Sequence, residues 1–126
     1  MKATSSRSFV RLALATTIIT YLLISVGAIV RVSGAGMGCP DWPRCFGLWV
    51  PPTSAEQLPP LGSYHYPPGW SVETFDPLMT WIEYGNRLLG AATGLFILAT
   101  LISALRTQRK NRGVVVPVVF AFVGVL

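Results

Sequence analysis

The chain has 126 residues, of which 52% are hydrophobic and 12% are charged, and its net charge is +5 at neutral pH. Soluble domains carry about 25% charged residues, so the composition excludes an ordinary soluble domain and indicates an integral membrane protein. The positive charge does not require a nucleic-acid partner, because basic loops facing anionic lipid headgroups account for it.

The first apolar segment, residues 12–30, contains no charged residue. A membrane-spanning helix needs about 20 apolar residues, so we predict a transmembrane helix over residues 9–30 after a cytoplasmic N-terminus of residues 1–8. Signal peptides have an apolar core of roughly 7–15 residues, which favours an uncleaved helix here.

Residues 31–79 are predicted to form a long extracytoplasmic loop. Proline pairs interrupt it and favour extended backbone, so its middle is expected to be irregular. Four aromatic residues in this loop suit the membrane–water interface, where a ring meets a polar tip. They are Trp49, Tyr64, Tyr66 and Trp70.

Cys39 and Cys45 lie close together near the start of this loop. An oxidising compartment favours a disulfide between them, and closing so short a loop would stabilise the fold by about 2 kcal/mol. The bond would be either a simple staple or a redox-active, site-shaping element, and both interpretations remain open. No metal site is predicted, since zinc would find only His65 as a further conventional ligand. His65 is expected to be a solvated loop residue.

The second transmembrane helix is predicted over residues 80–105. Thr80 is the expected N-cap, and Glu83 stands at the capping-box spacing. A polar-to-small face follows along this helix at spacings of three and four residues. Its members are Glu83, Asn86, Arg87, Gly90 and Gly94.

This face has two interpretations. Glu83 and Arg87 form either an i,i+4 ion pair or a site in which Glu83 handles protons and Arg87 binds a carboxylate. The GxxxG pattern at Gly90 lets either a helix or a flat ligand approach closely. Arg31 and Arg44 lie on the same side of the membrane, where they would contact an acidic amphiphile or lipid phosphates.

A basic loop, residues 106–113, follows and is expected to be cytoplasmic, because loops rich in Lys and Arg stay on that side. All five acidic residues lie between residues 41 and 83, which supports an outer location for that segment. Residues 114–126 are too short to span a membrane. We interpret them as the start of a truncated third transmembrane helix, the alternative being a buried or re-entrant segment.

Two segments resemble the haem A synthase family. Residues 27–47 (GAIVRVSGAGMGCPDWPRCFG) resemble the end of its first helix with the first outer loop, and residues 81–90 (WIEYGNRLLG) resemble the start of its second helix. The resemblance implies an all-α membrane bundle, of which this chain would be the N-terminal part. It implies that the whole enzyme oxidises the C8 methyl of haem O to the formyl of haem A for terminal oxidase biogenesis, and that this fragment alone is inactive.

The same resemblance assigns roles to residues. Cys39 and Cys45 correspond to the outer-loop cysteine pair, and Glu83 to the acidic catalytic residue near the substrate. The expected haem-contact residues are Arg31, Arg44, Asn86, Arg87, Gly90 and Gly94. Asn86 departs from the family pattern, which usually has a histidine haem ligand there, so we expect a subgroup that holds its substrate haem with fewer axial ligands.

Haem O is then the expected substrate, and a haem b cofactor is expected in a missing C-terminal half. The expected location is the cell inner membrane, with several spans. Expected partners are the lipid bilayer, haem O synthase and terminal oxidase assembly proteins. The alternatives are a non-catalytic helix-bundle subunit or assembly factor of a respiratory oxidase, and a quinone-linked thiol–disulfide oxidoreductase.

Overall fold

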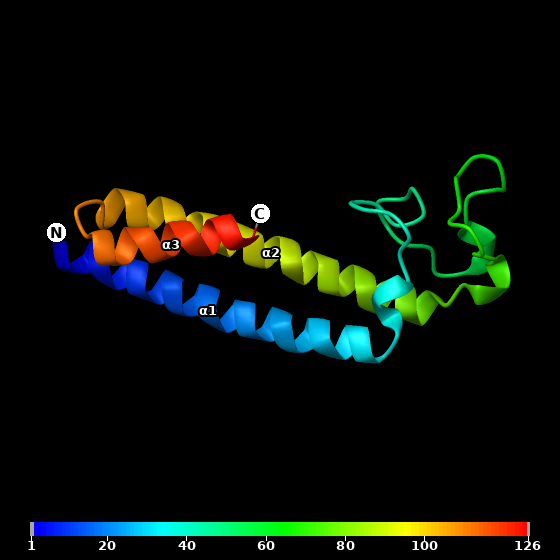
Figure 1. The fold of residues 1–126 in the computed structure, drawn as a ribbon, viewed down its shortest axis with the longest axis horizontal. Coiled ribbons are helices and arrows are strands. Elements are labelled where there is room, and N and C mark those ends of the chain that lie inside the picture. Colours follow the sequence, from blue (N-terminus) through cyan, green and yellow to red (C-terminus); the bar gives the residue numbers. More distant parts are fainter. Residues whose placement is uncertain (1, 126) are drawn as a thin grey trace. The chain divides into compact units, whose positions relative to one another are not determined.

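The computed structural model describes residues 2–125, with side chains from residue 7 onward, and this part of the chain is all-helical without a strand. Its α-helices are α1 (Lys2–Val32), α2 (Pro77–Thr107) and α3 (Arg112–Val125) (Figure 1). Three short 3-10 helices lie at Ala35–Met37, Ala55–Gln57 and Val72–Thr74. The predicted all-α class is confirmed. Residues 1 and 126, at the ends of the predicted N-terminal tail and third helix, lie outside the described residues.

Two stretches are long and apolar enough to cross a membrane, Arg7–Val32 and Pro77–Thr107. They contain the predicted segments 9–30 and 80–105, but the helices extend further at their ends. The segment expected as an N-terminal tail is helical from Lys2. Sequence hydropathy marks the apolar part of a helix, whereas its backbone hydrogen bonds continue into polar flanks.

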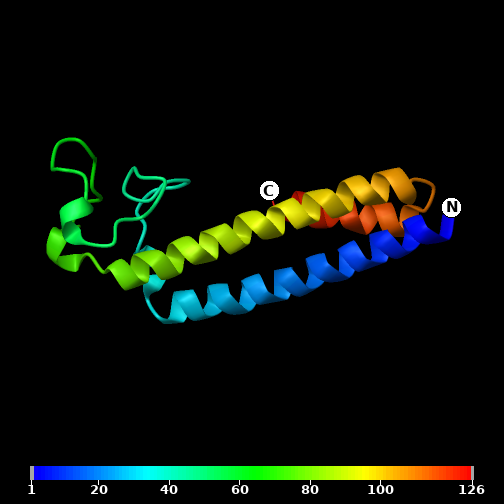
Figure 2. The same ribbon diagram turned by 180° about the vertical axis from the view of Figure 1, so that it is seen from behind.

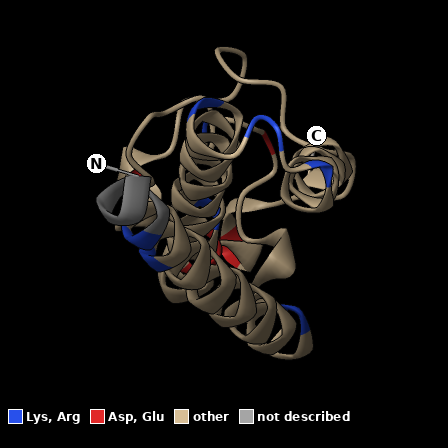
Figure 3. Cartoon of the chain, turned by 90° about the vertical axis from the view of Figure 1, so that its left-hand side faces the viewer, with Lys and Arg blue, Asp and Glu red and all other residues tan. Residues whose placement is uncertain are grey.

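The contacts divide the chain into two compact units. The first comprises Met1–Ile24 with Leu89–Leu126, and the second comprises Ser25–Leu88. In the first unit, the hydroxyls of Thr16 on α1 and Thr100 on α2 are hydrogen-bonded at 2.7 Å. A tight turn then joins α2 to α3, which runs back from it (Figure 2). Figure 3 looks onto this end of the unit, where the turn and the start of α3 carry basic residues.

In the second unit, the loop between α1 and α2 has a core of its own. Phe46 is 1% exposed and packs among Tyr64, Tyr66, Trp70 and Phe75, with ring centroids 5.3–6.3 Å apart. Aromatic pairs at such distances add about 0.5–1.5 kcal/mol each beyond area burial. Three of the four aromatic residues assigned to the membrane interface therefore line the core of this loop. Trp49, by contrast, is 63% exposed.

The predicted start of α2 was wrong. The helix begins at Pro77, and the carboxylate of Asp76 accepts hydrogen bonds from the backbone N–H groups of Leu78 and Met79 at 2.8 and 3.2 Å. Asp76 thus acts as the N-cap, with proline at the first helical position, where its missing N–H costs nothing. Thr80 is buried instead, and its hydroxyl donates to the carbonyl oxygens of Asp76 and Gly38.

Candidate functional site

Cys39 and Cys45 form a disulfide, which confirms the predicted pairing. Both are buried, at 5% and 0% exposure. Cys39 Sγ lies 3.7 Å from the carbonyl oxygen of Thr80 on α2. Thiol–disulfide exchange requires access to a sulfur atom. The burial of both cysteines therefore favours the staple interpretation over an exposed redox centre.

The disulfide segment, residues 38–49, contains a tight turn just after the bonded cysteines, and Asp41 holds this turn. The backbone N–H and C=O groups of Cys45 and Leu48 are hydrogen-bonded to each other at 2.9 and 3.1 Å. Phe46 and Gly47 between them have φ values of 54° and 73°. Positive φ at both central residues is the type I′ pattern, which glycine adopts without cost. The Asp41 carboxylate accepts hydrogen bonds from the N–H groups of both residues and so holds the turn.

Gly38 lets the disulfide segment lie directly on the start of α2. A Cβ atom at this position would be 2.8 Å from backbone atoms of both Met79 and Thr80, which is closer than atoms can pack. Helix α1 ends just before, where Gly34 takes a φ of 79°. A glycine with positive φ is the usual way to end a helix. These two glycines therefore turn the chain out of α1 and press it against α2.

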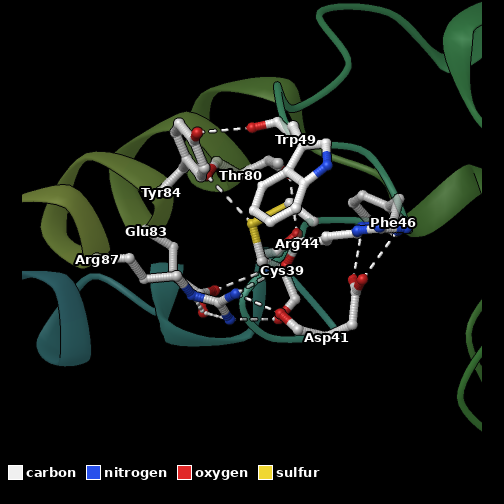
Figure 4. The surroundings of a disulfide bond; sticks show 12 residues. Cys39, Asp41, Arg44, Phe46, Trp49, Thr80, Glu83, Tyr84 and Arg87 are labelled. Carbon is white, nitrogen blue, oxygen red and sulfur yellow. Dashed lines mark hydrogen bonds and ion pairs between the residues drawn. A yellow bond between two sulfur atoms is a disulfide. The ribbon is translucent and has the colours of Figure 1, made fainter. Parts of the chain in front are cut away.

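Glu83 and Arg87 hold the same segment from the α2 side (Figure 4). Glu83 is 8% exposed, and its Oε2 accepts the backbone N–H of Cys39 at 2.8 Å. Its Oε1 accepts Arg87 Nε at 3.1 Å, so the predicted i,i+4 ion pair is present. Both carboxylate oxygens are therefore engaged.

Arg87 also binds backbone carbonyl groups of the disulfide segment. Its Nη2 donates to the Cys39 carbonyl at 2.8 Å, and its Nη1 donates to those of Asp41 and Arg44. All three guanidinium nitrogens are therefore used within this unit. The guanidinium of Arg44 lies 5.0 Å from the centre of the Trp49 ring. This cation–π contact holds the Arg44 side chain at the surface of the unit.

Beside the Glu83–Arg87 ion pair lies a surface cavity of about 520 Å³. Four of the predicted site residues line it: Arg31, Glu83, Asn86 and Arg87. Arg31 is exposed there, and its side chain enters none of the hydrogen bonds or ion pairs found among residues 7–125. Asn86 Oδ1 is buried and has no hydrogen-bond partner among the described residues. A Cβ on Gly27 of α1 would lie 3.8 Å from that oxygen, so the two helices pass closely at this level.

Gly90 and Gly94 do not line this cavity and belong to the first unit. A Cβ at Gly90 would meet only Leu23 Cδ1, at 3.9 Å, and one at Gly94 would meet nothing within 4 Å. Within the described part of the chain, neither glycine is therefore needed for close helix packing.

Tyr64 extends the polar network of Asp41 into the aromatic core. Burial raises the pKa of Tyr64 to about 12, and the neighbouring Asp41 carboxylate adds to the shift. Burial also raises the pKa of Tyr66. Because an ionised phenol is disfavoured there, both side chains stay neutral over the physiological range.

Sequence comparison shows the family of this chain. The family model COX15-CtaA, described as cytochrome oxidase assembly protein, matches residues 10–126. The chain belongs to the COX15-CtaA family. This membership and the two apolar helices make it a membrane protein of a haem-related family.

Relatives of this COX15-CtaA member include two proteins named heme A synthase. The one from Shewanella oneidensis is 36% identical over 92 residues, which are 73% of this chain and 26% of the relative. The one from Geobacillus kaustophilus is 26% identical over 95 residues, 75% of this chain and 23% of the relative. A protoheme IX farnesyltransferase from Halobacterium salinarum is 25% identical over 112 residues, 89% of this chain and 19% of the relative.

The chain thus spans about a quarter or less of the length of these relatives. No solved structure matches it. Its single histidine, His65, is exposed in the loop, as expected. No imidazole is available on α1, α2 or α3 as an axial ligand, so the residues of this COX15-CtaA chain do not fit a haem b cofactor.

Sequence reasoning missed four residues of the site. Gly38, Asp41, Thr80 and Tyr84 all join the disulfide segment to itself or to α2, and Tyr84 does so by donating its hydroxyl to the Trp49 carbonyl at 2.6 Å. Asp41 carried a usable signal, because Asp followed by a Phe-Gly turn suggests a carboxylate binding backbone N–H groups. The other three depend on contacts between distant segments.

Proposed function

We propose that this chain is the N-terminal part of a haem A synthase, which oxidises the C8 methyl of haem O to the formyl of haem A. The observation that carries the proposal is the family match over residues 10–126, together with a heme A synthase 36% identical over 92 residues. The cavity beside Glu83 supports it, because it joins a carboxylate, an exposed arginine and an unpartnered amide oxygen.

The net reaction replaces two C–H bonds of the methyl group by a C=O bond. Written with water as the oxygen source, R–CH₃ + H₂O gives R–CHO with release of four protons and four electrons. The four electrons would pass one at a time to a one-electron acceptor outside this chain. A base close to the methyl group accelerates such a reaction by taking up protons as they are released.

Glu83 is our candidate for that base. Its carboxylate lines the cavity, and the Cys39 N–H and the Arg87 guanidinium fix its position. Preorganised positioning of this kind is what catalysis requires of an acid–base group. The disulfide then contributes by holding Cys39 in place.

Arg31 is our candidate for binding a haem O propionate, because its guanidinium is exposed at the cavity and guanidinium pairs well with carboxylate. Arg87 contributes by holding Glu83 and the disulfide segment in place, because its donors already have partners. Arg44 is a further haem-contact candidate at the surface of the unit. Asn86 would contact the macrocycle as a polar neighbour without acting as a strong iron ligand. Gly90 and Gly94 remain haem-contact candidates on the small face of α2.

In this proposal the protein lies in the inner membrane with its N-terminus in the cytoplasm and residues 31–79 outside. The basic residues before the first apolar segment and those of residues 106–112 would then face the cytoplasm, as the positive-inside rule favours. Haem O synthase, which would supply the substrate, and oxidase assembly proteins are the proposed partners. The 126-residue chain alone is expected to be inactive.

The test uses the full-length protein that contains this chain, expressed in cells lacking their own haem A synthase. Glu83→Gln should keep protein level and haem content but lose most haem A, as measured by chromatography of extracted haems. Glu73→Gln, an exposed loop carboxylate, is the matched control and should retain haem A. Haem A at wild-type level in Glu83→Gln would remove Glu83 from the reaction. No haem A from the wild type would favour the assembly-factor alternative.

A further inference from the structure

The turn between α2 and α3 concentrates positive charge that has no partner within its unit. Four basic residues stand within seven positions, and all are exposed: Arg106, Arg109, Lys110 and Arg112. The first unit contains no Asp or Glu in its sequence, since every acidic residue lies between residues 41 and 83. Among the described residues, the salt bridge found is that of Arg87 with Glu83, in the other unit. These four cations therefore have no acidic partner in their unit and are available to anions from outside the chain.

The backbone of this turn is already ordered. Gln108 N–H donates to Ala104 at 2.8 Å and Asn111 N–H donates to Gln108 at 2.7 Å, while Val114 and Val115 donate to the Asn111 carbonyl. The basic side chains thus project from an ordered turn, Arg109 and Lys110, and from the helix ends beside it, Arg106 and Arg112. A ligand that binds them does not have to order the backbone, which lowers the cost of association.

The same residues surround a surface cavity of about 830 Å³, which is lined by residues 106–112 alone. Apolar helices leave this loop on both sides, α2 with its spanning segment and α3 with a run of Val and Phe. A basic turn between apolar helices is expected to lie at the surface of a membrane, and Figure 3 shows the Lys and Arg residues at this end of the chain in blue. Arginine binds phosphate through paired N–H donors and lysine binds it as a point charge.

From this placement we infer that residues 106–112 form a binding site for the headgroup of an anionic phospholipid, with the phosphate in the cavity and the acyl chains along α2 and α3. The apolar flanks favour a lipid over a free phosphate, because they add contacts that only acyl chains can make. This site shares no residue with the proposed haem site, whose candidate base Glu83 lies in the other unit.

The experiment measures lipid binding to the purified 126-residue chain in detergent by native mass spectrometry, with phosphatidylglycerol as the anionic probe and phosphatidylcholine as the neutral one. Phosphatidylglycerol should bind more tightly than phosphatidylcholine, and its binding should weaken as the salt concentration is raised. Arg109→Gln with Lys110→Gln should weaken its binding about 30-fold, at about 1 kcal/mol per charge. Arg109→Lys with Lys110→Arg keeps both charges and should bind as the wild type does.

Equal binding of the two lipids by the wild type would overturn the site without recourse to any variant. So would unchanged phosphatidylglycerol binding in a double glutamine variant whose circular dichroism matches the wild type. Displacement of phosphatidylglycerol by an equal concentration of inorganic phosphate would show that the loop takes a free anion, which also overturns the lipid proposal.

Discussion

The Cys39 backbone N–H donates to the Glu83 carboxylate at 2.8 Å, although the two residues are 44 positions apart in the sequence. The disulfide in the loop between α1 and α2 and the carboxylate on α2 are therefore parts of one structure. Anything that moves the disulfide segment also moves the environment of Glu83, which gives structural changes in the loop a functional readout.

Gly38→Ala should separate the disulfide segment from α2. The new Cβ would fall 2.8 Å from backbone atoms of Met79 and Thr80, which cannot move aside as a side chain can. Overpacking of this kind costs about 1–3 kcal/mol, so the thermal unfolding midpoint in detergent should fall. Gly36→Ala is the matched control, since a Cβ there would meet nothing within 4 Å, and it should leave the midpoint unchanged. Equal midpoints for the two variants would contradict the close approach.

Arg87→Ala should destabilise the second unit by more than an exposed ion pair would. The change removes the cation from Glu83 and leaves the carbonyl groups of Cys39, Asp41 and Arg44 without these donors. Removing one partner of a largely buried pair costs about 3 kcal/mol. Chemical unfolding monitored by tryptophan fluorescence measures this loss, because Trp70 lies in the loop core. Arg44→Ala, whose guanidinium sits at the surface of the unit, should cost less than 1 kcal/mol by roughly the scale of exposed cation–π contacts. A smaller loss of unfolding free energy for Arg87→Ala than for Arg44→Ala would contradict the role of Arg87 in holding the disulfide segment.

The loop should lose stability at alkaline pH. The pKa of Tyr64 is raised to about 12 in the fold from 10.0 for the free side chain. Between these values the unfolded chain has released the phenol proton while the folded chain still holds it, so stability falls as pH rises through this window and is fully retained below it. Phenolate absorbance should show one of the four tyrosines titrating near pH 12, and Tyr64→Phe should abolish that step. Titration of all tyrosines near pH 10 would contradict the burial of Tyr64.

Asn86 offers a test of the proposed haem site. Asn86→His in the full-length protein should place an imidazole beside the cavity and shift the absorption spectrum of bound haem toward a six-coordinate, low-spin form. Asn86→Ala should change that spectrum little, because the amide is a poor iron ligand. Loss of haem from Asn86→Ala would make Asn86 an essential contact. An unchanged spectrum in Asn86→His would show that this face of α2 does not meet the haem.

The sequence predicted well the structural features that depend on residues close together in the chain. The apolar segments predicted α1 and α2, and the short spacing of Cys39 and Cys45 predicted their bond. The ion pair of Glu83 with Arg87 followed from helical spacing. The start of α2 was misplaced because Thr80 matched a capping pattern that Asp76 satisfied one turn earlier.

Contacts between distant segments could not be predicted in this way. Nothing local to Gly38 shows that α2 will pass against it, and nothing local to Phe46 shows that aromatic residues much further along the chain will surround it. The acceptors of Arg87 are backbone carbonyl groups, which every residue has. The sequence therefore does not indicate which residues Arg87 contacts. Among the described residues, no helix packs closely on Gly90 or Gly94, because a GxxxG pattern allows close packing without requiring it.

The hydroxyl contact of Thr16 with Thr100 has a consequence for how the first unit assembles. Each hydroxyl also lies within hydrogen-bonding distance of a carbonyl of its own helix, that of Leu12 for Thr16 and that of Phe96 for Thr100. If α1 slid along α2, both hydroxyls would therefore keep an acceptor, and no polar group would be stranded in hydrocarbon. The Thr16–Thr100 contact therefore marks the register of α1 against α2, while neither hydroxyl depends on it for an acceptor.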